Sequence, residues 1–365
     1  MPETFLPATA RPDRPPGMVD VARVAGVSQK TVSRVINNEP YVRPQVRERV
    51  LEAAQTLGYR RNQAARALIS GRSHRIGVVS LGTALYGPAA VLIALERAAG
   101  SAGYSLTVAT TREGEASGVQ RAVDGLLEQG VEGIVLSEPI DEAPEPRVEC
   151  SVPVVSLGRM PGLRGDDVIV TGTQGEAAGR LATEHLLGLG HRTVWHVAGP
   201  ARWNAAGDRL AGWRAALGAA DAPEPPVLDG DWMPASGYAA GQVLAAQPDV
   251  TAVFVANDDM AIGVLRALAD AGRAVPDDVS VVGFDDVPAA QYLRPRLTTV
   301  RQDFDAMAST GLDLLVRRLE HRGDPPGPPP PVHQLVIRES TATRRPPAPA
   351  PAPTSPVAAN PSGWR

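Results

Sequence analysis

Residues 19–38 read VDVARVAGVSQKTVSRVINN, a pattern typical of two short helices joined by a tight turn. We expect Val19, Val21 and Val24 to form the apolar side of the first helix. Gly26 suits the turn because glycine adopts a left-handed backbone at little steric cost. Ser28 suits the N-cap of the second helix, where its hydroxyl oxygen can accept a free backbone N–H. The stretch therefore predicts a helix-turn-helix.

In the second helix, Val32, Val35 and Ile36 fall at i, i+3 and i+4 and should face inward. The opposite side carries hydrogen-bonding residues, which a recognition helix needs in the major groove of DNA. We expect Gln29 and Lys30, near the helix start, to contact bases. The remaining polar residues, Thr31, Ser33, Arg34 and Asn37, should contact phosphates. The alternative is a solvated polar face. The predicted DNA contacts of this helix are Ser28, Gln29, Lys30, Thr31, Ser33, Arg34 and Asn37.

The charge of the chain is unevenly distributed around this stretch. Residues 18–75 hold eleven Lys or Arg against four Asp or Glu, a net charge of +7, so the rest of the chain carries −11. Lys30 is the only lysine of the chain. A basic segment on an acidic body favours a small nucleic-acid-binding unit, although a basic coiled or disordered arm would show the same bias.

A third helix is expected to complete this unit. Pro44 suits a first helical turn, Val46, Val50, Ala53 and Leu57 would line one side, and Gly58 would end the helix. We predict a helix-turn-helix headpiece over residues 18–61. The basic segment that follows, residues 62–73, is too short to be a stable helix by itself and is expected to form a hinge or linker.

From residue 75 onward, short apolar runs rich in β-formers alternate with amphipathic stretches, as in RIGVVSL, YSLTVATT, GIVLS, VPVVSL, TVWHVAG, TAVFVAN and VSVVGFDD. This alternation predicts parallel sheets covered by helices on both faces, an α/β fold. About ten strands exceed one such domain, so we expect two doubly wound sub-domains, one over residues 74–172 and 304–331, the other over 173–303 and 332–340. Ligands bind beyond the carboxyl ends of such strands.

Several classes of protein are disfavoured by composition. Cys150 is the only cysteine, which argues against a disulfide framework and favours a reducing compartment. No apolar run is long enough to span a membrane, and no export signal precedes residue 18, so we expect a soluble cytoplasmic protein. The histidines show no metal-ligand spacing and no serine lies in a nucleophile elbow, so we expect no enzyme, metal or cofactor. Residues 1–17 and 341–365 are rich in Pro and Ala and are expected to be disordered.

A family resemblance accompanies these patterns. VDVARVAGVSQKTVSRVIN, GYRRNQAARAL, HLLGLGHR, DRLAGW, GDWMPASGY, VANDDMAIG, SVVGFDD and LTTVRQDF resemble, in order, segments of the lactose repressor (LacI) family of bacterial transcription regulators. The resemblance runs from about residue 19 to residue 340. It implies a headpiece, a hinge helix that orders on operator DNA, and an effector core of the periplasmic-binding-protein-like type I fold joined by three crossing strands.

The resemblance also implies contacts and an assembly. In the hinge it implies that Leu68 wedges into the minor groove, with Asn62 and Ala65 also at the DNA. It implies a homodimer on a near-palindromic double-stranded operator. The C-terminus is Pro-rich and carries no leucine heptads, so we expect the assembly to stop at a dimer.

By motif match, the family's effector pocket falls on five polar or aromatic residues and four wall residues. These are Arg209, Trp232, Asn257, Asp285 and Gln302, with Leu85, Gly87, Pro88 and Phe304 as walls. Charged, amide and aromatic groups in one site are typical of sugar recognition. Asn257 and Asp285 could instead cap helices. The sequence departs from the lactose repressor at Ala205 and Gly158, so a lactose-type specificity is not implied.

We therefore predict a sequence-specific DNA-binding repressor of sugar-utilisation genes that a sugar or glycoside inducer releases from its operator. The alternative is a sugar-binding module of a transport system without DNA binding. The headpiece pattern opposes that alternative.

Overall fold

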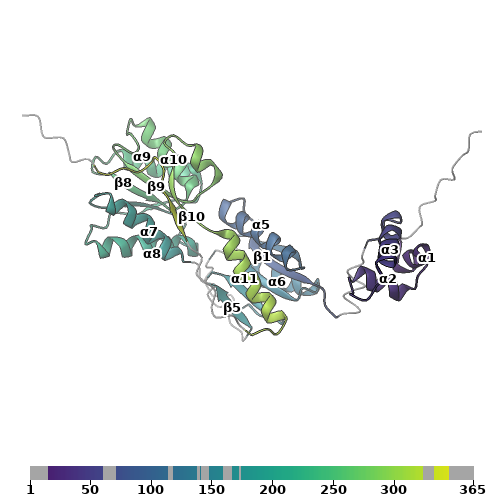
Figure 1. Cartoon of the computed structure of the whole chain (residues 1–365). Coiled ribbons are helices and arrows are strands. Elements are labelled where there is room, and N and C mark those ends of the chain that lie inside the picture. The colour runs from purple at the N-terminus through teal and green to yellow at the C-terminus, as the bar shows by residue number, and fades with distance from the viewer. Residues whose placement is uncertain are drawn as a thin grey trace, which may run out of the picture. The chain divides into compact units, whose positions relative to one another are not determined.

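The computed structural model describes residues 15–60, 71–113, 118–137, 140, 148–158, 167–171, 174–323 and 333–344. The chain divides into two units, Met1–Ser73 and His74–Arg365 (Figure 1). The predicted hinge contacts Asn62, Ala65 and Leu68 lie outside the described residues, as do residues 1–14 and 345–365.

The first unit contains three described helices, α1 (Met18–Ala25), α2 (Gln29–Ile36) and α3 (Pro44–Thr56). Gly26 adopts a left-handed conformation after α1, with φ of 64°, and Ser28 Oγ caps α2 by accepting the Thr31 N–H at 3.2 Å. The predicted helix, turn and N-cap are therefore confirmed. Residues from all three helices form one small core, namely Val21, Ala22, Ala25, Val32, Val35, Val50, Ala53 and Ala54.

The predicted apolar side of α1 was partly wrong. Val21 is fully buried, but Val19 and Val24 are 58% and 54% exposed. The buried side consists of Val21, Ala22 and Ala25, which follow the i, i+1, i+4 positions of one helix face. Small alanines allow the three short helices to approach closely, a contribution that a search for large apolar residues overlooks.

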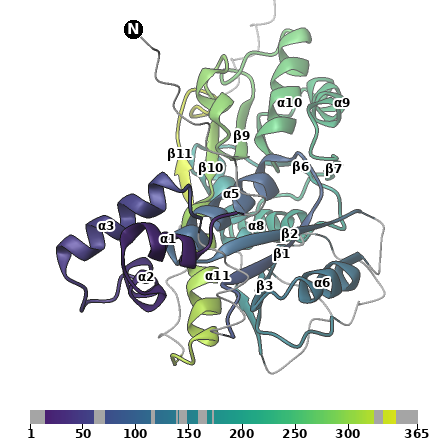
Figure 2. The ribbon, with the colours of Figure 1, turned by 90° about the vertical axis from the view of Figure 1, so that its right-hand side faces the viewer.

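The second unit contains two lobes, each built on its own sheet. Lobe 1 has the parallel strand order β2-β1-β3-β4-β5. Its strands are β1 (Arg75–Leu81), β2 (Ser105–Thr111), β3 (Gly133–Ser137), β4 (Val154–Leu157) and β5 (Val168–Thr171). Helix α6 (Gly118–Glu128) covers one face, and α5 (Tyr86–Ser101) with α11 (Phe304–Leu319) covers the other (Figure 2).

Lobe 2 has the order β11-β10-β9-β8-β6-β7, in which only β11 is antiparallel. Its strands are β6 (Trp195–Ala198), β7 (Leu228–Asp229), β8 (Ala252–Val255), β9 (Ser280–Asp285), β10 (Thr298–Arg301) and β11 (Gln334–Val336). Helices α7 (Gly175–Gly188) and α8 (Asn204–Ala219) pack on one face, and α9 (Pro234–Ala245) and α10 (Asp258–Asp270) on the other (Figure 1). A short 3₁₀ helix, η1 (Pro288–Tyr292), follows β9.

Burial in the sheets explains the continuous apolar runs of the sequence. Every residue of β8 and β9 is buried, because helices cover both faces of a parallel sheet. Successive residues of one strand enter different cores. Val253 packs with α9 and α10, whereas Phe254 packs with α7 and α8. The predicted fold class, a helical headpiece with a two-lobed α/β core, is confirmed.

The topology positions a site between the lobes. In both lobes the first strand is flanked by the second and third, so the strand order reverses there and opens a crevice at the carboxyl ends. Three segments connect the lobes, between β5 and α7, between β10 and α11, and between α11 and β11. Of these, only the connection from Arg301 to Phe304 lies wholly within the described residues.

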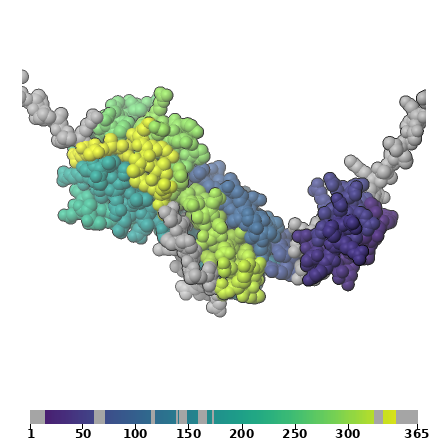
Figure 3. Space-filling view, in the orientation of Figure 1, coloured from purple at the N-terminus to yellow at the C-terminus, as the bar shows by residue number. Residues whose placement is uncertain are grey.

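Residues 341–344, which the sequence assigned to a disordered tail, are instead bound to lobe 2. Ala342 N donates to Ser280 Oγ at 3.1 Å, Arg344 N donates to Leu189 O at 2.9 Å, and Thr341 Oγ1 lies 3.1 Å from His185 Nε2. Figure 3 shows the C-terminal segment in yellow along the surface of lobe 2. The Ala342 N–H and the Thr341 hydroxyl thus find polar partners on lobe 2 that composition alone does not reveal. None of the described helices is both long and apolar enough to cross a membrane.

Candidate functional site

Helix α2, the candidate recognition helix, has two exposed side chains that make no polar contact within the described headpiece. Gln29 and Lys30 are exposed, and within residues 15–60 neither side chain makes a hydrogen bond or ion pair. They occupy the first two helical positions, after the Ser28 cap. A helix entering the major groove reads bases with its N-terminal residues, so this location fits the predicted role.

The other predicted contacts of α2 are partly engaged within the headpiece. Ser28 Oγ lies 2.9 Å from Thr31 Oγ1, and Asn37 Nδ2 donates to Ser33 Oγ at 3.3 Å. Arg34 Nε lies 3.5 Å from Glu39 Oε2, with both side chains about half exposed. Such an exposed pair is weak and can be exchanged for a phosphate.

Arg47 of α3 holds the end of α2, a role that sequence reasoning missed. Its guanidinium donates to Asn38 Oδ1 and to Glu39 O, both at 2.7 Å. Asn38 has a left-handed backbone with φ of 56°. Arg47 thereby fixes the chain reversal after α2 and orients the helix within the headpiece.

A cavity lies between the two lobes of the second unit, and we call it the effector cavity. It has an empty volume of about 750 Å³, including the part open to solvent, and sixteen residues line it. The structure brings all nine predicted ligand-binding residues to its wall, namely Leu85, Gly87, Pro88, Arg209, Trp232, Asn257, Asp285, Gln302 and Phe304.

Seven lining residues were not in the predicted set, and three of them follow a simple rule. Ser137 and Leu157 are the last residues of β3 and β4, and Tyr86 starts the helix after β1. The carboxyl ends of the lobe 1 strands could therefore have identified them. The remaining four, Val91, Trp203, Ala205 and Met307, come from helices or their caps; of these, the family resemblance had already pointed to the position of Ala205, and Trp203 stood near the matched arginine as an extra aromatic residue.

The centre of the site is a buried ion pair between Arg209 and Asp285. Arg209 NH2 lies 3.4 Å from Asp285 Oδ1, and the two side chains are 8% and 9% exposed. Arg209 NH1 donates to Ala256 O at 2.5 Å, and its Cζ lies 3.7 Å from the centroid of the Phe284 ring. The backbone acceptor and the aromatic face below fix the guanidinium plane.

The Asp285 carboxylate also accepts a hydrogen bond from Gln302 Nε2 at 2.7 Å. Burial raises the pKa of Asp285 to about 6, although the Arg209 guanidinium opposes that shift. Asp285 has a φ of 107°, an unusual conformation for a residue with a side chain. Backbone strain of this kind is concentrated at functional sites, where surrounding contacts hold it.

Trp232 forms an apolar wall of the cavity, and it too has a strained backbone, with φ of 72°. Asn257 holds it by donating from Nδ2 to Trp232 O at 3.0 Å, while Asn257 Oδ1 caps α10 by accepting from Met260 N. Asn257 is therefore a helix cap that also lines the cavity. Gly199 leaves room for the indole, since a Cβ at position 199 would collide with the ring. Trp232 Nε1 is buried and has no hydrogen-bond partner among the described residues.

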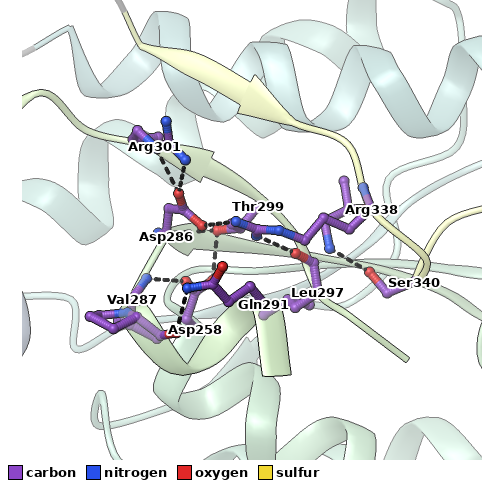
Figure 4. A network of polar contacts seen from close by, with 11 residues as sticks. Asp258, Asp286, Val287, Gln291, Leu297, Thr299, Arg301, Arg338 and Ser340 are labelled. Atoms are coloured by element: carbon purple, nitrogen blue, oxygen red, sulfur yellow. Dashed lines mark hydrogen bonds and ion pairs between the residues drawn. The ribbon is translucent and has the colours of Figure 1, made fainter. Parts of the chain in front are cut away.

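A polar network holds the chain that follows Asp285 at the end of β9 (Figure 4). Asp286 binds Arg301 and Arg338, each at 2.5 Å. Asp258 accepts from Thr299 Oγ1 at 2.6 Å and from Val287 N at 2.8 Å. These contacts join β9, β10, α10 and the C-terminal segment, so they set the direction in which Asp285 leaves its strand.

Asp258 gives the core a defined pH dependence. Burial and the neighbouring Asp285 raise the pKa of Asp258 from 3.8 to about 8. The folded state therefore holds this proton more tightly than the unfolded chain, and the resulting stability is lost as the pH rises through about 8. The buried histidines contribute in the opposite direction, since burial lowers the pKa values of His185, His191, His196 and His333 below 6.5. The histidines contribute equally in a variant of Asp258, so comparison with such a variant isolates the effect of Asp258.

We expect the unfolding free energy of the full chain to fall by about 1 kcal/mol, relative to the Asp258→Asn variant, between about pH 7 and pH 8. Urea unfolding at several pH values measures it. Asp258→Asn is the control, because Asn can accept from Val287 N and donate to Thr299 Oγ1. The slope should flatten in that variant, and an unchanged slope would assign the effect to another group.

Comparisons with known proteins give the same two-part division. The model of bacterial regulatory proteins of the lacI family matches residues 17–62, and the model of the periplasmic-binding-protein-like domain matches residues 183–341. The lactose operon repressor of Escherichia coli is 34% identical over 308 residues, covering 83% of this chain and 85% of the relative. CelR, an HTH-type transcriptional regulator of Thermobifida fusca, is 37% identical over 316 residues, covering 84% and 92%.

Solved structures agree over a similar length. The Lac repressor dimer bound to operator and the anti-inducer ONPF has a TM-score of 0.77 at 33% identity, covering 90% of this chain and all of that one. The complex of the transcriptional regulator CelR with cellobiose has a TM-score of 0.66 at 34% identity, covering 89% and 99%.

A helix-turn-helix headpiece joined to a two-lobed receptor core defines a DNA-binding regulator with a site for a small molecule. The chain belongs to the lacI family of bacterial regulatory proteins. A transport module without DNA binding, the alternative that the sequence left open, is not supported, because the headpiece matches the regulator family.

Proposed function

We propose that this protein is a transcriptional repressor that binds operator DNA through its headpiece and leaves it when a sugar occupies the effector cavity. The observation that carries the proposal is the joint presence of exposed Gln29 and Lys30 on α2 and of the Arg209–Asp285 pair beside Trp232 in the cavity. One part can read base edges, and the other can bind a hydroxylated ring.

A sugar suits the chemistry of the cavity wall. Arg209 donates hydrogen bonds, Asp285 accepts them, and Gln302 can do both, so together they match adjacent hydroxyl groups. Trp232 and Phe304 line the cavity and can pack against the apolar C–H groups of a ring. Relatives named for lactose and ribose operons, and the CelR complex with cellobiose, support a carbohydrate.

The active form is a homodimer on a near-palindromic operator. A two-fold symmetric dimer presents two copies of α2, and these match two half-sites related by the same symmetry. A solved relative is a Lac repressor dimer bound to operator. The segment 62–73 serves as the hinge, with Asn62, Ala65 and Leu68 at the minor groove.

Coupling between the sites follows from the position of the cavity. Its walls come from both lobes, so a ligand that fits one lobe arrangement better shifts the population toward it. We place the boundaries between the two lobes at positions 172–173, 303–304 and 331–332 of the sequence. Couplings of this type amount to about 1–3 kcal/mol, or roughly 5–150-fold in affinity.

We assign the protein to the cytoplasm, where operator DNA and the imported sugar meet, and we assign it no catalytic residue or cofactor. Its family consists of regulators. Measuring DNA affinity with and without sugar therefore tests its activity directly.

We expect purified full-length protein to select a near-palindromic sequence from a random duplex library. At least one sugar of a mono- and disaccharide panel should lower its affinity for that duplex by about 5–150-fold, measured by fluorescence anisotropy at fixed salt. If a sugar bound without changing duplex affinity, the repressor–inducer model would be wrong. If a sugar raised the affinity, the ligand would be a corepressor.

A further inference from the structure

A second cavity adjoins the effector cavity in the same crevice, and no predicted site residue except Leu85 and Trp232 belongs to it. Its empty volume is about 1230 Å³, including the part open to solvent. It shares Leu85, Trp203 and Trp232 with the effector cavity, so these side chains stand between the two spaces. Its other walls come from the segments after β1 and β2 in lobe 1 and, in lobe 2, from Pro200 after β6 and from the starts of α9 and α10.

Two tryptophans, Trp203 and Trp232, stand between the effector cavity and the second cavity. Trp203 and Trp232 meet edge to face, with ring centroids 5.6 Å apart and an interplanar angle of 71°. Both are almost completely buried, at 6% and 4% exposed. Trp203 also forms an isolated antiparallel bridge with Ile140 of lobe 1. Both tryptophans line both cavities, and the buried Nε1 of Trp232 has no hydrogen-bond partner among the described residues.

The second cavity is acidic. Asp231, Asp259 and Glu113 line it, and its described lining contains no Lys, Arg or His. Glu113 is close to Arg202 at 3.6 Å, and Asp231 Oδ1 accepts the Met233 N–H at 2.9 Å. Asp259 is half buried, and in the described part of the chain its carboxylate forms no hydrogen bond or ion pair. Burial raises the pKa of Asp259.

A carboxylate of this kind accepts hydrogen bonds from hydroxyl groups and repels anions. A phosphorylated sugar or a sugar acid in the second cavity would meet three carboxylates in a partly desolvated space. A neutral sugar ring would instead place its hydroxyls against Asp259 and its C–H face against tryptophan.

We propose that the effector is an uncharged oligosaccharide of at least two sugar units. One ring lies beside Arg209 and Asp285 in the effector cavity, and the next lies in the second cavity with a hydroxyl on Asp259. The glycosidic bond passes the Trp203–Trp232 pair, which both spaces share. This assignment rests on the proposed function of a sugar-responsive repressor and adds Asp259 and Trp203 as residues that set specificity for chain length and charge.

The test is isothermal titration calorimetry on the full-length protein. The probes are cellobiose, maltose, trehalose and lactose, their units glucose and galactose, and glucose 6-phosphate. At least one disaccharide should bind about tenfold or more tightly than its own units, a difference of about 1.4 kcal/mol. Glucose 6-phosphate should bind no more tightly than glucose.

Asp259→Ala should weaken that disaccharide about tenfold or more, as expected for a hydrogen bond to a charged group, and leave the monosaccharide unchanged. Asp259→Asn, which keeps an acceptor, should lie between. Asp249→Ala is the matched control, since it removes an exposed carboxylate of lobe 2 that lines neither cavity. Thermal melting of each variant excludes loss of folding as the cause.

The outcomes separate this inference from the proposed function. If disaccharides bind no tighter than their units, or if Asp259→Ala weakens both equally, the ligand occupies the effector cavity alone and the inference is wrong. If a monosaccharide alone releases the operator, the repressor function stands without the second ring. If no sugar binds while operator binding is intact, the sugar assignment itself fails and this inference fails with it.

Discussion

Replacing Arg209 with methionine should lower the unfolding free energy of the core by about 3–5 kcal/mol, because the variant leaves the buried Asp285 carboxylate without its cationic partner. Gln302 would remain as its only side-chain donor among the described residues. Loss of the guanidinium should raise the pKa of Asp285 further, so the destabilisation should be larger at pH 8 than at pH 6. Urea unfolding of the parent and the variant at the two pH values measures both effects.

The double variant Arg209→Met with Asp285→Asn separates folding from recognition. It removes both charges together, which is often neutral for stability, so most of the lost free energy should return. Effector binding should not return, since the ring loses a charge-assisted donor and a charge-assisted acceptor, each about 1.5–3 kcal/mol. A double variant that is stable and still releases the operator at the parent's sugar concentration would show that this pair is not the recognition centre.

The fold was predictable where the signal is local. The helix-turn-helix needs only Gly26, Ser28 and the spacing of Val32 and Val35, all within a dozen residues. The parallel sheets follow from fully buried strands such as β8 and β9, which appear in the sequence as unbroken apolar runs. Errors arose where small or polar residues make the contacts, as at Ala22 and Ala25 in the headpiece core and at Thr341 on lobe 2.

The sequence identified nine of the sixteen residues that line the cavity, but not the contacts that orient them. The family motifs and the strand ends identified Arg209, Asp285 and Gln302, and these side chains converge on one cavity. The contacts that orient them join residues far apart in the chain, such as Asp258 with Thr299, 41 positions later. Such pairs have no local pattern. The strained φ of Trp232 and the second cavity beyond it also depend on tertiary packing, so they were found only in the structure.

Substitution of Lys30 or Gln29 with alanine should change which operator bases the protein prefers. Each side chain is exposed at the start of α2 and makes no hydrogen bond or ion pair within residues 15–60. It can therefore form a hydrogen bond with a base edge. Loss of one good base contact costs about 1–3 kcal/mol, or roughly 5–150-fold, at the base pair concerned. Anisotropy titrations against the selected operator and all its single-base variants, at two salt concentrations, measure this.

The pattern of loss distinguishes a base contact from a phosphate contact. If Lys30 reads a base, Lys30→Ala should make the protein indifferent to sequence at one position of each half-site and leave the ranking elsewhere unchanged. A phosphate contact would instead weaken every duplex alike and reduce the salt dependence by about one ion, since each neutralised phosphate releases close to one counterion. Arg23→Ala is the charge-matched control, because Arg23 lies on α1 and pairs with Asp20 at 3.0 Å. Uniform weakening by Lys30→Ala, indistinguishable from that control, would move base recognition to another part of the headpiece.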